Sequence, residues 1–121
     1  MGTVSVSVFV YGTLKPGHLR WPMVAPFVDA TEAAEVEGRL WDTGNDFPAA
    51  RFGPPGRIRG VLLHLKRDCE DEAIRLLDEV EGEFLYRRAQ VRTADGRAAV
   101  AYEWRGATDA FIELDGVWDG V

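Results

Sequence analysis

Hydrophobic and polar residues alternate strictly near the start of the chain. From Thr3 to Tyr11 a valine occupies every second position, and serine, serine and phenylalanine stand between the valines. A period of two is typical of a β-strand whose two faces meet different surroundings, so we predict a strand over residues 3–11. Gly12, followed by Pro16 and Gly17, predicts that a tight loop leaves the end of this strand.

Two further apolar segments, residues 35–42 and 57–66, also predict strands. The residues between them include the runs GNDFP and FGPPG, so we predict an irregular connection that packs over the sheet or borders a site. Residues 19–28 are apolar as well. Because Pro22 and Pro26 interrupt this segment, it predicts a short helix at most.

One segment, residues 69–80, has the periodicity of an amphipathic helix. Apolar side chains recur at helical spacing on one side of it, at Ala73, Ile74, Leu77 and Val80. Asp68 is placed to cap the start of the helix, and Gly82 stands where a terminating glycine belongs. This is the one principal helix that the sequence predicts.

The remainder of the chain predicts extended structure. Residues 85–93 and 97–104 predict two strands joined at Asp95-Gly96, a typical hairpin turn, and residues 109–121 predict a last extended piece. No repeat, low-complexity tract or linker interrupts the chain. We therefore expect one α+β domain over residues 1–121, with a curled or barrel-like sheet and one principal helix packed on it.

Charge and composition exclude several classes of function. The chain has 121 residues, 14 of them basic and 20 acidic, and a formal net charge of -6, which disfavours binding to nucleic acid. No apolar run is long enough to cross a membrane and no secretory signal is recognisable, so we expect a cytoplasmic protein. Cys69 is the only cysteine and the two histidines have no metal-ligand spacing, so neither a disulfide nor a metal site is expected. The sequence leaves both a monomer and a homodimer open.

Carboxylates crowd the predicted end of the helix, at Asp78, Glu79, Glu81 and Glu83. There they would meet the negative end of the helix dipole and one another, an arrangement that makes ionisation of a carboxylate harder. Glu81 lies at the edge of the predicted apolar face and is a candidate general base, with Asp78 as its main competitor. For Asp78, Glu79 and Glu83, a solvated acidic surface with Arg87 and Arg88 nearby is the plainer interpretation.

The loop after the first predicted strand has a second candidate function. In YGTLKPG, consecutive backbone N–H groups at Gly12, Thr13 and Leu14 form a potential nest for a carboxylate or an oxyanion. Gly12 would serve there if the backbone takes an unusual dihedral angle or approaches a ligand closely. An ordinary turn after a strand explains the same residues.

Four segments together resemble the γ-glutamyl cyclotransferase-like family, which includes γ-glutamylamine cyclotransferases and small bacterial members. They are FVYGTLKPG at 9–17, VEGRLWD at 36–42, LDEVEG followed by YRR within 77–88, and AYEW at 101–104. The resemblance implies a mixed, barrel-like sheet flanked by helices. It also implies an enzyme that cyclises a γ-glutamyl group to 5-oxoproline, expels the attached amine or amino acid, and uses no metal or organic cofactor.

The resemblance also assigns roles to individual residues. Glu81 matches the family's catalytic glutamate, and Gly12, Thr13 and Leu14 match its anion-binding loop. The three tyrosines of the chain fall within the matched segments and become substrate-binding candidates, at Tyr11, Tyr86 and Tyr102. Arg88 matches a family position and would orient Glu81, bind a substrate carboxylate or, the role we favour, offset the acidic cluster.

Two questions stay open at the level of sequence. The loop YGTLK is nearer the branch acting on γ-glutamylamines, while the glycine of LDEVEG is typical of the branch acting on γ-glutamyl amino acids. The sequence therefore does not decide between these two classes of substrate. A small-molecule binding domain that retains the fold without turnover is the alternative function.

Overall fold

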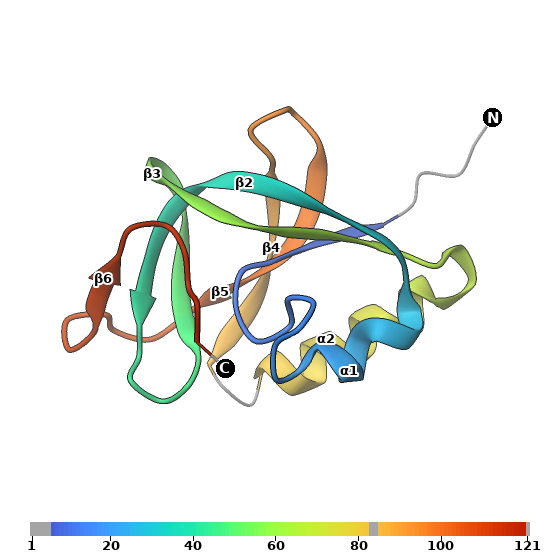
Figure 1. Ribbon diagram of the computed structural model, residues 1–121, viewed down its shortest axis with the longest axis horizontal. Coiled ribbons are helices and arrows are strands. Elements are labelled where there is room, and N and C mark those ends of the chain that lie inside the picture. Colours follow the sequence, from blue (N-terminus) through green and yellow to red (C-terminus); the bar gives the residue numbers. More distant parts are fainter. Residues whose placement is uncertain (1–5, 83–84, 121) are drawn as a thin grey trace.

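The computed structural model describes residues 6–82 and 85–120 and has the α+β architecture that the sequence predicts (Figure 1). These described residues form six strands, two α-helices and two short 3₁₀ helices. In chain order these are β1 (Ser7–Val10), α1 (Trp21–Val24), η1 (Ala25–Phe27), β2 (Val28–Asp42), β3 (Pro48–Leu65), η2 (Arg67–Cys69), α2 (Glu70–Gly82), β4 (Tyr86–Arg92), β5 (Ala98–Trp104) and β6 (Ile112–Leu114).

The strands form one mixed sheet that does not close into a barrel, in the order β4-β5-β1-β3-β2-β6. β1 lies at its centre, antiparallel to β3 and parallel to β5, where Val8 faces Val100. The other neighbouring strands are antiparallel. The mixed sheet implied by the family resemblance is therefore confirmed.

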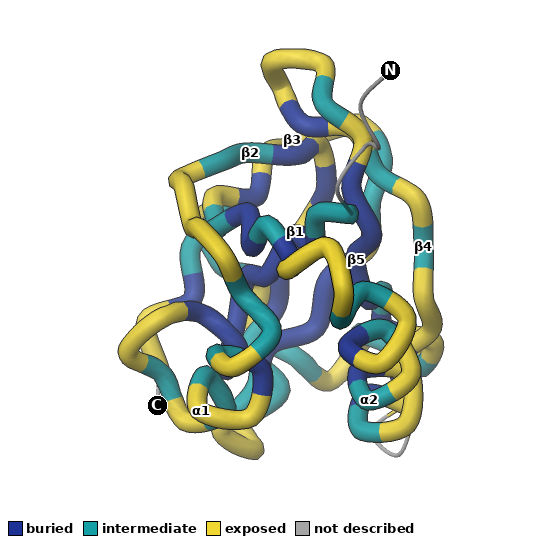
Figure 2. Tube along the Cα trace, turned by 90° about the vertical axis from the view of Figure 1, so that its right-hand side faces the viewer, coloured by how far each residue is buried: buried dark blue, intermediate teal, exposed yellow. Residues whose placement is uncertain are grey.

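β1 is short and buried. Val8, Phe9 and Val10 are each at most 3% exposed, and Figure 2 shows β1 beside β5 in the buried centre of the molecule. The strand predicted over residues 3–11 thus spans only Ser7–Val10 among the described residues, and residues 3–5 lie outside them. Its carboxyl end, which leads into the loop at Tyr11, points into the protein rather than to its surface.

The irregular connection predicted between residues 42 and 57 is wrong for most of its length. β3 begins at Pro48, and only residues 43–47 turn between β2 and β3. The register shifts from Glu37 opposite Arg57 to Gly38 opposite Phe52, so the GPPG run forms a bulge within the strand rather than a loop. β2 also begins earlier than predicted, at Val28, because its first half pairs with the second half of β3.

α2 carries one buried stripe. Ala73, Leu77 and Glu81, spaced four residues apart, are the buried residues of the helix. The predicted helix is confirmed, although Asp68 lies within η2 before it and the helix begins at Glu70. Because the stripe continues through Glu81, the carboxylate faces the core and not merely the edge of the apolar face.

The remaining predicted elements agree with the structure. The prolines limit residues 19–28 to the short helices α1 and η1, and β4 pairs with β5 through the turn at Asp95-Gly96. The tail contributes the three residues of β6 and a buried Trp118. Both α-helices lie at the same end of the molecule (Figures 1 and 2).

Neither a membrane-spanning helix nor a metal-binding cluster occurs among the described residues. No helix in residues 6–82 and 85–120 is long and apolar enough to cross a membrane. The same residues contain no group of three histidine, cysteine or carboxylate side chains arranged to hold a metal ion.

Candidate active site

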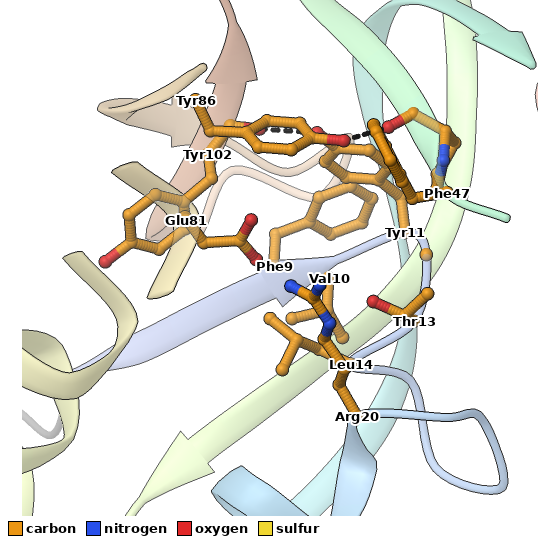
Figure 3. Close-up of a pocket in the computed structure, with 12 residues that line it drawn as sticks. Phe9, Val10, Tyr11, Thr13, Leu14, Arg20, Phe47, Glu81, Tyr86 and Tyr102 are labelled. Carbon is orange, nitrogen blue, oxygen red and sulfur yellow. Dashed lines mark hydrogen bonds between the residues drawn. The ribbon is translucent and has the colours of Figure 1, made fainter. Parts of the chain in front are cut away.

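A pocket opens at the carboxyl end of β1, with an empty space of about 430 Å³ that includes its open mouth (Figure 3). The end of α2 and the strands β4 and β5 form one wall, and the loop after β1 forms the opposite one. All seven site residues singled out from the sequence line it. The lining consists of Phe9, Val10, Tyr11, Gly12, Thr13, Leu14, Arg20, Phe47, Pro48, Glu81, Tyr86 and Tyr102.

Glu81 brings a carboxylate into this largely apolar space. The residue is only 8% exposed. Burial raises the pKa of the Glu81 carboxyl from its usual 4.5 to about 7, while the positive charge of Arg20 acts in the opposite direction. A group that titrates near neutral pH both removes and returns protons readily.

Asp78, the competitor of Glu81 in the sequence, has a different position. Its side chain is 41% exposed, and its Oδ2 lies 3.5 Å from Nη1 of Arg88. Its Oδ1 accepts a hydrogen bond of 2.8 Å from the hydroxyl of Tyr102. Asp78 therefore positions a pocket tyrosine from outside, and Arg88 contacts the acidic cluster.

The loop after β1 presents its backbone to the pocket. Among the described residues, the N–H groups of Gly12, Thr13 and Leu14 donate to no other backbone group, while the carbonyls of Gly12 and Thr13 accept from Lys15 and Arg20. Buried N–H groups ordinarily have partners, so three consecutive N–H groups at a pocket wall are suited to bind an anion.

Gly12 is required by space rather than by its dihedral angles. Its φ lies outside the left-handed region, but a Cβ there would stand 2.7 Å from both Cδ and Cγ of Pro48. The loop therefore packs directly against the start of β3.

The three tyrosines are held by hydrogen bonds to the protein. The Tyr11 hydroxyl donates to the carbonyl of Tyr102 over 2.5 Å, and the Tyr86 hydroxyl donates to the carbonyl of Pro48 (Figure 3). Burial is the main reason that the pKa values of all three tyrosines lie above the usual value. The rings therefore remain neutral and fixed, and each hydroxyl oxygen retains a lone pair to accept a hydrogen bond.

Sequence reasoning missed Arg20, Phe47 and Pro48. Arg20 lies in residues 19–28, where only the prolines led to a prediction, although it is the first arginine or lysine after Lys15. Phe47 lies in the short turn between β2 and β3, and Pro48 begins β3; the sequence predicted an irregular connection for both. Part of that prediction is nevertheless confirmed, because the segment borders the pocket.

The fold and the pocket define a small α+β domain in which a buried carboxylate and a glycine-containing loop line the same pocket. Residues 8–120 match the family described as Gamma-glutamyl cyclotransferase, AIG2-like. The chain belongs to this family of cyclotransferases. No curated protein is significantly similar to it in sequence.

Several solved structures share the fold. An uncharacterized protein from Pyrococcus horikoshii is 24% identical, with a TM-score of 0.69, over 95% of this chain and 91% of that chain. A protein specific to uropathogenic E. coli is 15% identical, with a TM-score of 0.72, over 96% of this chain and 94% of that one. Kluyveromyces lactis allophanate hydrolase is 12% identical with a TM-score of 0.66, and the match covers 92% of this chain but 19% of that enzyme. At these identities the likeness establishes the fold alone.

Proposed function

We propose that the protein is a γ-glutamyl cyclotransferase that converts a γ-glutamyl amine or γ-glutamyl amino acid into 5-oxoproline and the free amine or amino acid. The observation that carries this proposal is the burial of the Glu81 carboxylate in a pocket bordered by the amides of residues 12–14. Membership of the family supports cyclotransferase chemistry in general.

The first step requires a base. The α-amine of a γ-glutamyl group is an ammonium near neutral pH, and an ammonium has no free electron pair with which to attack. Glu81, with its pKa raised to about 7, is partly ionised at neutral pH and takes one proton from the ammonium. No metal or organic cofactor takes part in this scheme.

The second step forms the ring. The free amine attacks the γ-carbonyl carbon, a new C–N bond closes the five-membered lactam, and the carbonyl oxygen becomes an oxyanion. The amides of Gly12, Thr13 and Leu14 stabilise that charge. After ring closure the attacking nitrogen still carries one proton more than the lactam does. When the intermediate collapses, the C–N bond to the leaving amine breaks and Glu81 returns its proton to that nitrogen. Glu81 then takes the extra proton from the ring nitrogen and passes it to the released amine, which leaves as an ammonium.

Cyclisation also requires that the substrate chain be folded back on itself. Holding a reactive conformer contributes strongly to the rate of an intramolecular reaction. Tyr86 packs edge-on against both Phe47 and Trp104, with ring centroids 6.3 Å and 5.4 Å apart. Such a fixed aromatic wall restricts the conformations open to a bound γ-glutamyl chain.

The direct test is to incubate the purified protein with γ-glutamyl amines and γ-glutamyl amino acids and to measure 5-oxoproline by mass spectrometry. We expect stoichiometric release of 5-oxoproline and the amine from at least one of the two classes. Glu81→Gln keeps the size of the side chain, removes the base and should lower kcat by about 100-fold or more.

Glu79→Gln is the matched control, because Glu79 is an exposed neighbour on the same helix and does not line the pocket. It should retain the wild-type rate. Recovery of intact γ-glutamyl ligand from a tight complex after long incubation, with no 5-oxoproline from any compound, would instead support a binding domain without turnover.

A further inference from the structure

Two charged side chains line the pocket, and the reaction proposed above uses only one of them. Glu81 is the anion, and Arg20 is the single cation among the pocket-lining residues of the described chain. The other ten are apolar, aromatic or neutral polar. A pocket with a few convergent polar groups fixes its ligand mainly through those groups, so the guanidinium of Arg20 is a candidate contact for a bound ligand.

Arg20 is anchored to the loop that carries the candidate oxyanion site. Its backbone N–H donates a hydrogen bond of 2.8 Å to the carbonyl of Thr13, and its own carbonyl accepts one of 3.0 Å from Met23 at the start of α1. The backbone of Arg20 is therefore held beside the loop whose amides border the pocket.

The guanidinium points across the pocket toward the carboxylate of Glu81, with Phe9 and Leu14 nearby (Figure 3). The charge of Arg20 also acts on Glu81 and on Tyr86, where it opposes the rise in pKa caused by burial. A positive and a negative group thus share one small space on opposite walls.

We propose that Arg20 binds the α-carboxylate of the substrate, which makes the site selective for γ-glutamyl compounds whose α-carboxyl group is free. This inference rests on the proposed function. The α-carbon of a γ-glutamyl group carries an ammonium and a carboxylate side by side, so when Glu81 receives the ammonium, the carboxylate must lie close to Glu81. Arg20 is the cation in that place, and its planar fork suits bidentate binding of a carboxylate.

A carboxylate contact at Arg20 affects both the choice of substrate and the role of the loop amides. Glutamyl or glutaminyl residues inside a peptide, whose α-carboxyl group is part of a peptide bond, lack the charge that Arg20 binds and are excluded. The loop amides are left to bind the oxyanion rather than the α-carboxylate. The ring-forming atoms then lie between Glu81, Arg20 and the loop.

The test compares two lactams that differ only in the carboxylate: 5-oxoproline, which carries one, and 2-pyrrolidinone, which does not. Titration by NMR or calorimetry should give at least 10-fold tighter binding of 5-oxoproline to the wild type. Arg20→Gln should weaken 5-oxoproline binding by about 10- to 100-fold, the range of one charge-assisted contact, and leave 2-pyrrolidinone unchanged. Arg20→Lys should restore part of the loss.

Arg75→Gln removes the same charge from an exposed position on α2, outside the pocket, and should bind both lactams as the wild type does. In turnover, Arg20→Gln should raise KM for a γ-glutamyl amine more than it lowers kcat. The difference in KM between that substrate and its α-carboxamide analogue should also be smaller in Arg20→Gln than in the wild type.

The inference is overturned if the wild type binds the two lactams equally or binds neither, or if Arg20→Gln binds 5-oxoproline as tightly as the wild type. The outcomes also separate the carboxylate-binding role of Arg20 from the proposed cyclotransferase function. Turnover with an unchanged KM in Arg20→Gln contradicts the role of Arg20 alone. Arg20-dependent binding of 5-oxoproline by a protein that turns over no γ-glutamyl compound contradicts the cyclotransferase function and retains the carboxylate site.

Discussion

At the residue scale, Glu81 combines burial with the ability to ionise near neutral pH. Its position on the stripe of Ala73 and Leu77 brings it inward, and the positive charge of Arg20 limits how far its pKa rises. Sequence reasoning reached Glu81 through the acidic cluster and the LDEVEG match. It did not reach Arg20, because the relation of that side chain to Glu81 depends on how the loop folds.

The burial of Glu81 has a consequence for stability. Its pKa is about 7 when folded and near 4.5 when unfolded, so the folded state holds the extra proton. The resulting stabilisation is fully present below about pH 4.5 and is lost as the pH rises through about 7. Glu81→Gln should abolish this dependence, and the unfolding free energy of the wild type relative to the variant should fall by about 3 kcal/mol between pH 4.5 and 8.

Urea unfolding at both pH values measures that difference. The other titratable groups are common to the wild type and Glu81→Gln, so their contribution to the pH dependence cancels when the two unfolding free energies are subtracted. An unchanged difference across the range would show that Glu81 titrates as an ordinary exposed carboxylate.

The close packing of Gly12 against Pro48 can be tested with a single substitution. In Gly12→Ala the added Cβ would stand 2.7 Å from the ring of Pro48, whose carbonyl accepts the hydrogen bond from Tyr86. We expect a loss of about 1–3 kcal/mol in stability and lower activity, because the loop and β3 must move apart.

Gly82→Ala is the control for Gly12→Ala, since nothing lies within 4 Å of a Cβ at position 82 and its φ is outside the left-handed region. It should gain up to about 1 kcal/mol, as alanine does over glycine in a helix. Thermal unfolding of both variants checks the pair, and equal stabilities would contradict the proposed packing of Gly12.

At the scale of elements, the loop after β1 is joined to the chain's last segment. Lys15 is only 9% exposed and its Nζ donates a hydrogen bond of 2.7 Å to the carbonyl of Trp118. The N–H of Arg59 in β3 donates to Gly116 in the same segment. The tail therefore secures the loop whose amides border the pocket.

Lys15→Met should test this connection, because methionine retains much of the side chain but leaves the Trp118 carbonyl without its donor. We expect unfolding in urea to require about 1–2 kcal/mol less free energy. Lys66→Met, at the chain's only other lysine and an exposed one, should be close to neutral. If Lys15→Met proved as stable as Lys66→Met, the hydrogen bond would contribute nothing to the fold.

The periodic elements were predictable from sequence, and the non-local pairing was not. The stripe of α2 and the Asp95-Gly96 hairpin depend on residues near one another in the chain. The long β2–β3 ladder depends on partners up to 37 positions apart, from Val28 to Leu65, and on a bulge that holds the GPPG run within the strand. Glycine and proline predicted a loop there because local propensity carries no information about a partner strand.

At the scale of the whole molecule, the sheet brings distant segments to one pocket. β1 and β5 lie side by side at the centre of the sheet, so the loop at Tyr11 lies next to Tyr102. The end of α2 lines the same pocket as both. The family motifs allowed the seven site residues to be named from sequence, but the fold alone does not specify a reaction. The same fold occurs within Kluyveromyces lactis allophanate hydrolase. Chemistry must therefore be tested at Glu81.

The pH dependence of kcat/KM for 5-oxoproline release tests the central claim most directly, because it reports the titration of the free enzyme's base. Between pH 5 and 7.5 we expect kcat/KM of the wild type to rise with a midpoint near 7, the pKa of Glu81, and that of Glu81→Gln to be at least about 100-fold lower. A profile that is flat over this range, or a Glu81→Gln variant that keeps the wild-type kcat/KM, would contradict the role of Glu81 as the base.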